Sequence, residues 1–234
     1  MKDLILVDFD DTLVNTGPRF QGARRSLVAL MAEAGFDEDV ARDMLYNQVD
    51  PGMRTTYGLG PKRMEPSFTE TYRRLCELHD VAVDEAFVTR ACALCRACFG
   101  PPPAFEGALD ALRRLSSELP TVVYTQSGDI EYQLECVRGS GIVDIIREDR
   151  VHVCGHKNAD MFLRTIRHYG IADPAHSWMV GNSMRSDINP ALEAGANAIL
   201  VETVDPWEYD LVEPVSDAYQ RAPSFPHAVD LLLT

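Results

Sequence analysis

The sequence predicts an α/β protein in which a doubly wound parallel sheet carries an inserted all-helical subdomain. Three observations predict this fold class: short apolar runs alternate with helical patterns, the first run is apolar on both faces, and one long stretch contains helical patterns without strands. The chain has 234 residues, 46% of them hydrophobic, which is enough for one sheet domain with a large insertion.

Five short apolar runs are expected to form the sheet. They lie at residues 4–7, 121–124, 150–153, 177–180 and 197–201. The first, Leu-Ile-Leu-Val, has no polar position, which is typical of a strand covered on both faces. Apolar residues at helical spacing predict helices between the later runs, at 106–119, 130–140, 160–169 and 191–194. Asn189-Pro190 before the last of these helices and Gly195 after it are typical start and stop signals.

The stretch from residue 17 to residue 103 interrupts this alternation. Its pattern predicts helices near residues 19–35, 38–48, 65–79 and 84–99. Pro51-Gly52 and the loop 57–62 are expected to separate them, and Gly100–Pro103 is expected to be a stiff return linker. We therefore expect residues 1–16 and 104–234 to form the sheet domain and residues 17–103 to form the helical subdomain.

Charge and cysteine content exclude several classes of protein. The formal net charge is −14, so the protein is expected to repel nucleic acids and anionic membranes. No apolar run approaches the ~18 residues of a membrane helix, and no export signal is recognisable, so a cytoplasmic location with reduced thiols is expected. Cys92, Cys95 and Cys98 are spaced three apart on a predicted helix and would not converge on a metal, so we interpret them as buried thiols.

Reactive side chains follow four of the predicted strands. Asp8 and Asp10 follow the first strand, Thr125 ends the second, and Lys157 and Asp187 follow the third and fourth. Ligands of open α/β sheets bind at the carboxyl ends of strands, so these residues are expected to converge. Carboxylates that repel one another need a hard divalent cation, and oxygen ligands suit Mg²⁺. A carboxylate nucleophile, a second acid, a hydroxyl and an ammonium are together typical of phosphoryl transfer.

These residues carry a resemblance to a known family. The stretch Asp8-Phe-Asp-Asp-Thr12, followed by Leu13, resembles the first motif, DxDxT, of the haloacid dehalogenase superfamily. Thr125 and Lys157 resemble its second and third motifs, and Gly181-Asn182-x4-Asp187 resembles its fourth. The resemblance implies a Rossmann-like core with a helical cap. It implies Asp8 as nucleophile and Asp10 as general acid and base. It also implies Mg²⁺ on the side chains of Asp8 and Asp187 and the main-chain carbonyl of Asp10.

One position departs from the family pattern. The fourth motif usually begins Gly-Asp, whereas this chain has Asn182, which is interpreted as a neutral metal ligand or a water-holding group.

Asp11 has no assigned chemistry and is expected to cap a turn or helix. Thr125, Gln126 and Lys157 are expected to bind the phosphate group of the substrate. Arg54 and Lys62 in the insertion are expected to contact the rest of it.

The resemblance leaves three functions open. The first is Mg²⁺-dependent hydrolysis of small phosphorylated metabolites through an aspartyl-phosphate. Asp10 favours phosphoryl chemistry over dehalogenation, since a halide leaving group needs no proton. The alternatives are a sugar-phosphate mutase and a non-catalytic phosphate-binding relative.

Overall fold

The computed structural model describes residues 3–204 and 206–234 of the chain. The chain divides into two compact units. The core unit consists of residues 1–17 and 101–234, and the helical unit consists of residues 18–100. The core unit contains two buried apolar clusters and the helical unit contains one among the described residues.

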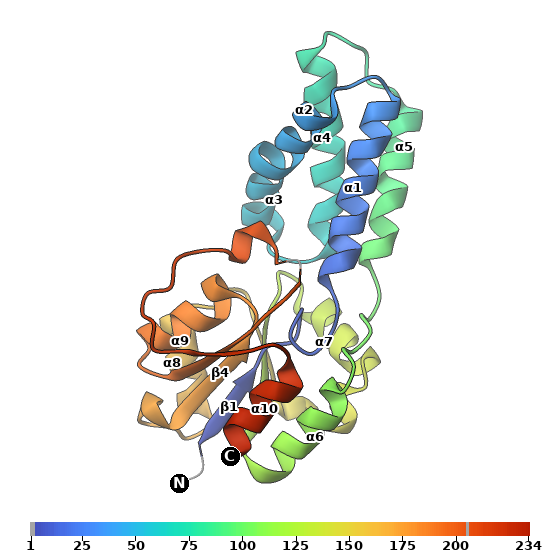
Figure 1. Cartoon of the computed structure of the whole chain (residues 1–234). Coiled ribbons are helices and arrows are strands. Elements are labelled where there is room, and N and C mark those ends of the chain that lie inside the picture. The colour runs from blue at the N-terminus through green and yellow to red at the C-terminus, as the bar shows by residue number, and fades with distance from the viewer. Residues whose placement is uncertain (1–2, 205) are drawn as a thin grey trace. The chain divides into compact units, whose positions relative to one another are not determined.

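The core unit is built on a six-stranded sheet whose paired strands run parallel (Figure 1). The strands are β1 (Leu4–Val7), β2 (Thr121–Gln126), β3 (Val151–Cys154), β4 (Ser177–Gly181), β5 (Asn197–Val201) and β6 (Gln220–Ala222). Their order in space is β3-β2-β1-β4-β5-β6. The chain thus adds strands on both sides of β1, which confirms the predicted doubly wound α/β class.

Helices cover both faces of the sheet. They are α6 (Ala108–Glu118), α7 (Ile130–Gly139), α8 (Ala159–His168), α9 (Asn189–Glu193) and α10 (Phe225–Leu233). Successive residues of β1 point to opposite faces. Ile5 and Val7 lie in the apolar cluster that includes α6, α7 and α10, whereas Leu4 and Leu6 lie in the cluster that includes α8 and α9. All four are buried, which explains why the β1 sequence contains no polar residue.

The last strand and the last helix were not predicted from the sequence. Gln220 and Arg221 of β6 are exposed and only Ala222 is buried, so this short edge strand has no apolar run to identify it. It pairs with β5 nonetheless. The following helix, α10, buries Phe225 and Val229 against the α6 side of the sheet. Both elements depend on contacts distant in sequence rather than on local pattern.

Every secondary-structure element described in the helical unit is a helix. They are α1 (Gly17–Glu33), α2 (Glu38–Asp43), the π-helix η1 (Met44–Val49), α3 (Asp50–Tyr57), α4 (Met64–Leu78) and α5 (Glu85–Leu94). The expected break at Pro51-Gly52 is wrong, because α2, η1 and α3 follow one another without a loop. Pro51 is the second residue of α3 and follows the π-helix η1 directly.

Short turns complete the structure. They are η2 (Pro61–Arg63), η3 (Cys95–Cys98), η4 (Ile142–Asp144), η5 (Glu148–Arg150), η6 (Pro174–His176), the π-turn η7 (Met184–Ile188) and η8 (Glu208–Asp210). No helix among the described residues is both long and apolar enough to span a bilayer. The predicted helix over 84–99 ends at Leu94, so Cys95 and Cys98 lie in the 3-10 turn that follows. Both are buried and neither forms a disulfide, and burial together with neighbouring thiols raises the pKa of Cys95 to about 12.

Candidate active site

The carboxyl edge of the sheet brings together side chains from four separate stretches of the core unit. Asp8 comes directly after β1, and its N–H donates to the carbonyl of Val180 in β4 at 2.9 Å. This bond fixes the backbone of Asp8 at the point where the two central strands end. Thr125 lies in β2, Lys157 lies in the loop that follows β3, and Asp187 lies in η7, which follows β4.

The Lys157 ammonium lies between two of the carboxylates. Its Nζ is 2.5 Å from Asp8 Oδ1 and 2.6 Å from Asp187 Oδ1. All three side chains are buried, with at most 9% of any of them exposed. Burial alone would lower the pKa of Lys157, but the charges of Asp187 and Asp8 raise it above its usual value. Lys157 is therefore a fixed positive charge at this edge.

The ionised form of Asp8 remains electrostatically unfavourable in spite of its contact with Lys157. Burial is the main reason that its pKa is raised well above its ordinary value, and the neighbouring charge of Asp187 raises it further. Lys157 acts in the opposite direction, and Asp10 adds a smaller unfavourable charge. Two carboxylates thus share one ammonium and a third acts on Asp8 from nearby, so additional positive charge would stabilise the ionised site.

The backbone of the fourth motif is shaped around Asp187. A Cβ placed on Gly181 would lie 2.3 Å from Asp187 Oδ2, so no larger residue fits at position 181. The same oxygen accepts the N–H of Ser183 at 3.0 Å. The Ser183 hydroxyl in turn donates to Asp210 at 2.6 Å. The space at Gly181 and the N–H of Ser183 therefore place the Asp187 carboxylate, and Asp210 fixes the side chain of Ser183.

Asn182 contacts the first motif through Thr12. The Thr12 hydroxyl lies 3.2 Å from Asn182 Oδ1 and 3.4 Å from Asp8 Oδ2. Within residues 3–204 and 206–234, no three His, Cys, Asp or Glu side chains gather closely enough to hold a metal ion by themselves. The oxygen-rich donor set nevertheless fits a hard cation that also takes main-chain, amide or water ligands.

Asp10 forms the second half of the site with Thr125. Asp10 Oδ1 accepts the Thr16 hydroxyl at 2.6 Å, and its Oδ2 accepts the amide of Gln133 at 2.6 Å. The same amide nitrogen lies 3.0 Å from Thr125 Oγ1. The structure thus joins Asp10 and Thr125 through a glutamine of α7.

The remaining residues proposed for substrate binding have other contacts in the structure. Gln126 Oε1 accepts the backbone N–H of Lys157 at 2.9 Å, which orders the Lys157 loop. In the helical unit, Arg54 donates to Asp50 at 3.2 Å and is 18% exposed. Lys62 is exposed in the turn η2.

Sequence reasoning missed four residues that support the site: Thr16, Gln133, Ser183 and Asp210. Each acts through a hydrogen bond to a residue of the motifs or to another of the four, and no local spacing marks them. Asp11 caps the turn after the first motif, since its Oδ1 accepts the N–H groups of Thr16 and Gly17 at 3.0 and 2.7 Å. Burial raises the pKa of Asp11 to about 6.

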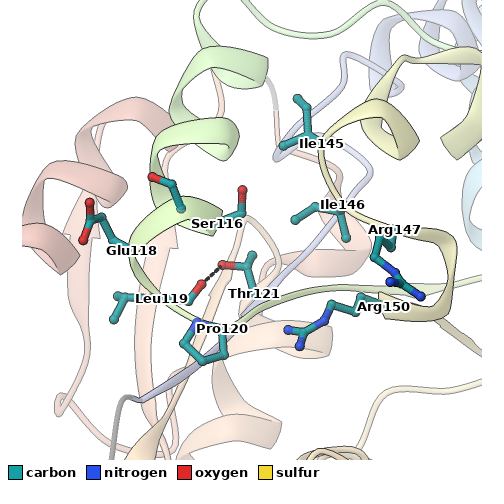
Figure 2. A pocket seen from close by; sticks show the side chains of 10 residues that line it. Ser116, Glu118, Leu119, Pro120, Thr121, Ile145, Ile146, Arg147 and Arg150 are labelled. Atoms are coloured by element: carbon teal, nitrogen blue, oxygen red, sulfur yellow. Dashed lines mark hydrogen bonds between the residues drawn. The ribbon is translucent and has the colours of Figure 1, made fainter.

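A shallow hollow of about 390 Å³ lies away from these residues (Figure 2). Thr121, the first residue of β2, lines it, whereas Thr125 stands near the opposite end of that strand. Figure 2 shows Arg147 and Arg150 on one side and Glu118 on the other. The hollow therefore belongs to the amino edge of the sheet and contains none of the residues predicted for the site.

Comparison with known proteins identifies the family and the fold. A family model described as haloacid dehalogenase-like hydrolase matches residues 2–195. No curated protein sequence gives a significant match. A haloacid dehalogenase-like hydrolase from Xanthomonas campestris superposes with a TM-score of 0.78 at 24% identity, covering 99% of this chain and 91% of the other.

Two further solved structures share the fold at lower identity. The putative hydrolase YfnB from Bacillus subtilis, bound to magnesium, has a TM-score of 0.61 at 16% identity and covers 100% of this chain and 99% of its own. A 2-haloacid dehalogenase from Pseudomonas syringae pv. tomato has a TM-score of 0.57 at 16% identity and the same two coverages. At these identities the likeness establishes the fold alone, because one fold supports several chemistries.

Proposed function

The chain belongs to the haloacid dehalogenase-like hydrolases, and from that premise we propose that it hydrolyses small phosphate monoesters through an aspartyl-phosphate. The observation that carries the proposal is the arrangement around Asp8. Its buried carboxylate lies beside the fixed charge of Lys157, and a second acid, Asp10, follows two residues later. A nucleophile, a charge stabiliser and a proton donor are thus assembled at one edge of the sheet.

The reaction proceeds in two displacements on phosphorus. An oxygen of Asp8 attacks the phosphorus, the bond to the ester oxygen breaks, and the departing alcohol takes a proton from Asp10. Asp10 then removes a proton from water, the hydroxide attacks the phosphorus, and inorganic phosphate leaves with the Asp8 carboxylate restored. The hydroxyl of Thr125 and the ammonium of Lys157 hold the phosphoryl oxygens, and Gln126 supports them by ordering the Lys157 backbone.

The proposed cofactor is Mg²⁺. The side chains of Asp8 and Asp187 and the main-chain carbonyl of Asp10 would hold it, with Asn182 as a neutral ligand or water holder. The excess of carboxylates over ammonium groups at this edge supports a divalent cation. When bound, Mg²⁺ supplies neutralising charge for the transferring phosphoryl group. The same charge would draw an anionic substrate to a protein with a net charge of −14.

Asp10 favours phosphatase over dehalogenase chemistry. Structures with this fold include proteins described as phosphatases and proteins described as dehalogenases. A halide leaves without a proton, so a dehalogenase has no use for a positioned acid, whereas an alcohol leaving group does. Asp10 is held by two hydrogen bonds, which supports a role for it in the reaction. Arg54 and Lys62 of the helical unit are proposed to contact the part of the metabolite beyond its phosphate.

The test measures which product the enzyme releases. Purified protein is incubated with a panel of phosphate monoesters and, in parallel, with 2-chloropropionate, and inorganic phosphate and chloride are both measured. We expect phosphate release that requires Mg²⁺ and is stopped by EDTA, with no chloride release. Release of chloride alone, or of neither ion, would overturn the proposal. Conversion of a hexose phosphate to its isomer without phosphate release would replace it with the mutase.

A further inference from the structure

We propose that Gln133 is a positioning residue that aligns Asp10 and Thr125 for the first step of the reaction. This inference rests on the proposed function and names a residue outside the four motifs. Gln133 lies in the first turns of α7, and its side chain reaches the carboxyl edge from the helix that follows β2. It is 6% exposed, so its amide is buried among the groups that it contacts.

The hydrogen-bond chemistry of an amide gives this contact its direction. The Gln133 nitrogen carries two hydrogens and no acceptor lone pair. It lies 2.6 Å from Asp10 Oδ2 and 3.0 Å from Thr125 Oγ1, so both oxygens must accept from it. One side chain therefore fixes the separation and orientation of the acid and the hydroxyl that act in the same step.

This direction determines what each partner can do. Asp10 Oδ2 accepts from Gln133 and Oδ1 accepts the Thr16 hydroxyl at 2.6 Å, so the orientation of the carboxylate that gives a proton to the leaving alcohol is fixed at both oxygens. Thr125 Oγ1 also accepts from Gln133, so its own hydrogen is directed away from the amide and is available to a phosphoryl oxygen. Gln133 touches neither the phosphorus nor the leaving group, and its effect passes through these two residues.

The position of Gln133 is fixed by its helix. Asp129 caps α7, since its carboxylate accepts the N–H of Tyr132 at 3.3 Å and its carbonyl accepts the N–H of Gln133 at 3.0 Å. The cap sets where the helix begins and therefore which residue faces the site. Cys136 and Val137, on the next turn, are buried in the core cluster and hold the same face of α7 against the sheet.

The experiment compares substrates whose leaving groups differ in their need for a proton. Gln133→Met keeps the length of the side chain and removes the donor. We measure kcat/KM for p-nitrophenyl phosphate, whose leaving group departs without protonation, and for the best alkyl phosphate of the panel, whose leaving group requires it. The ratio kcat/KM reports steps up to leaving-group departure, so it isolates the step in which Asp10 acts as an acid.

We expect Gln133→Met to lower kcat/KM for the alkyl phosphate by about 10²-fold and for p-nitrophenyl phosphate by less than about fivefold. Thr125→Val is the matched control, because it removes the other partner of the amide. It should lower kcat/KM equally for both substrates, since both lose the hydroxyl that holds a phosphoryl oxygen. Thermal melting of each variant reports whether the fold is kept. Gln133→Glu keeps length and polarity and should lose alkyl turnover at least as strongly, because its carboxylate would face Asp10.

Equal losses for the two substrates, or no loss, in both Gln133→Met and Gln133→Glu would overturn the inference. Failure of the proposed function has a different signature, since the wild-type protein itself would then release phosphate from neither substrate. The two failures are thus separated by the behaviour of the wild type.

Discussion

The molecule contains two buried ion clusters of opposite composition. In the core unit, one ammonium, that of Lys157, lies between the carboxylates of Asp8 and Asp187. In the helical unit, one carboxylate, that of Asp50, accepts hydrogen bonds from the guanidinium groups of three arginines, Arg24, Arg54 and Arg63. The first cluster is rich in carboxylates and the second is rich in cations.

The two clusters differ in how well their central groups are satisfied. Both oxygens of Asp50 are occupied, since Oδ2 accepts from Arg24 at 2.9 Å and Oδ1 accepts from Arg63 at 3.1 Å and Ser67 at 3.2 Å. Asp8 instead has a raised pKa even with Lys157 beside it. Carboxylates held in an unfavourable environment at the end of a strand are typical of catalytic sites, whereas a fully bonded carboxylate between helices is typical of a structural one.

The largest effect is expected for Asp8→Asn. Removal of the nucleophile should lower phosphate release by about 10³-fold or more, and the free energy of unfolding should fall by no more than about 1 kcal/mol or should rise. The physical reason is the raised pKa of Asp8: the stability linked to it is present at pH below its ordinary pKa and is lost as the pH rises through the raised value. Urea unfolding at pH 7 together with a phosphate-release assay checks both parts. A variant that is inactive because it unfolds would contradict this account.

Asp50→Ala in the helical unit is expected to have its main effect on the free energy of unfolding, in contrast to Asp8→Asn. Its loss would leave buried guanidinium groups without the carboxylate that they share, which should lower the free energy of unfolding by about 3–5 kcal/mol. Urea unfolding measures this change. Asp39→Ala is the control, because the Asp39 side chain is 91% exposed and its removal should cost less than about 0.5 kcal/mol. Equal stability of the two variants would mean that the arginine cluster contributes nothing to the fold.

The fold was largely predictable from the sequence because its central strands carry an unambiguous pattern. A run such as Leu4–Val7 is apolar at every position because both faces of the sheet are covered. β6 was not predictable, since an edge strand with a single buried residue has no such pattern. The continuity of the helical path through Pro51 was misjudged because proline beside glycine is typical of a turn or loop.

The residues of the candidate site also divide into those that could be predicted from the sequence and those that could not. Asp8, Lys157 and Asp187 follow predicted strands, so their convergence could be inferred from the parallel topology before any contact was known. Gln133 could not be identified, because it is 123 residues from Asp10 in sequence and occupies an ordinary inward position of an amphipathic helix. Asp210 lies in a loop after the fifth strand, where nothing in the sequence distinguishes it from other acidic surface residues.

For Asp210→Asn we expect a smaller effect, which is a change in how the free energy of unfolding depends on pH. Burial raises the pKa of Asp210 from its ordinary 3.8 to about 6, and its bond from the Ser183 hydroxyl only partly offsets this. Its contribution to stability is therefore present below pH 3.8 and is lost as the pH rises through about 6. The amide oxygen of asparagine still accepts from Ser183 but never ionises. The variant should therefore gain about 1–3 kcal/mol at pH 8 and progressively less toward pH 5.

Urea unfolding in EDTA at intervals from pH 5 to pH 8 measures this difference. A variant whose stability stays parallel to that of the wild type over the whole range would show that the Asp210 carboxylate costs the fold nothing. That result would restrict the unfavourable carboxylates of the core unit to the immediate surroundings of Lys157 and would sharpen the contrast with Asp50.

The smallest effect is expected for Arg54→Ala, which tests whether the cation-rich cluster is purely structural. Arg54 is 18% exposed, whereas the side chains of Arg24 and Arg63 are nearly fully buried. Its removal should lower the free energy of unfolding by about 1 kcal/mol, because Asp50 keeps its bonds to the other two arginines. If Arg54 also binds the substrate, Arg54→Ala should in addition raise KM by about three- to tenfold and leave kcat unchanged. This is the result expected for an interaction made equally in the ground and transition states.

The matched control is Arg74→Ala, which removes a pair with Glu70 at the same i,i+4 spacing on α4, where the arginine side chain is 45% exposed. Steady-state kinetics on the best phosphate monoester of the panel and urea unfolding are measured for both variants. If KM is the same in both, Arg54 belongs with Arg24 and Arg63 as a structural cation. If KM rises in Arg54→Ala alone, one cluster of the helical unit has both functions: its buried arginines hold Asp50, and its partly exposed arginine, which also donates to Asp50, contributes to substrate binding.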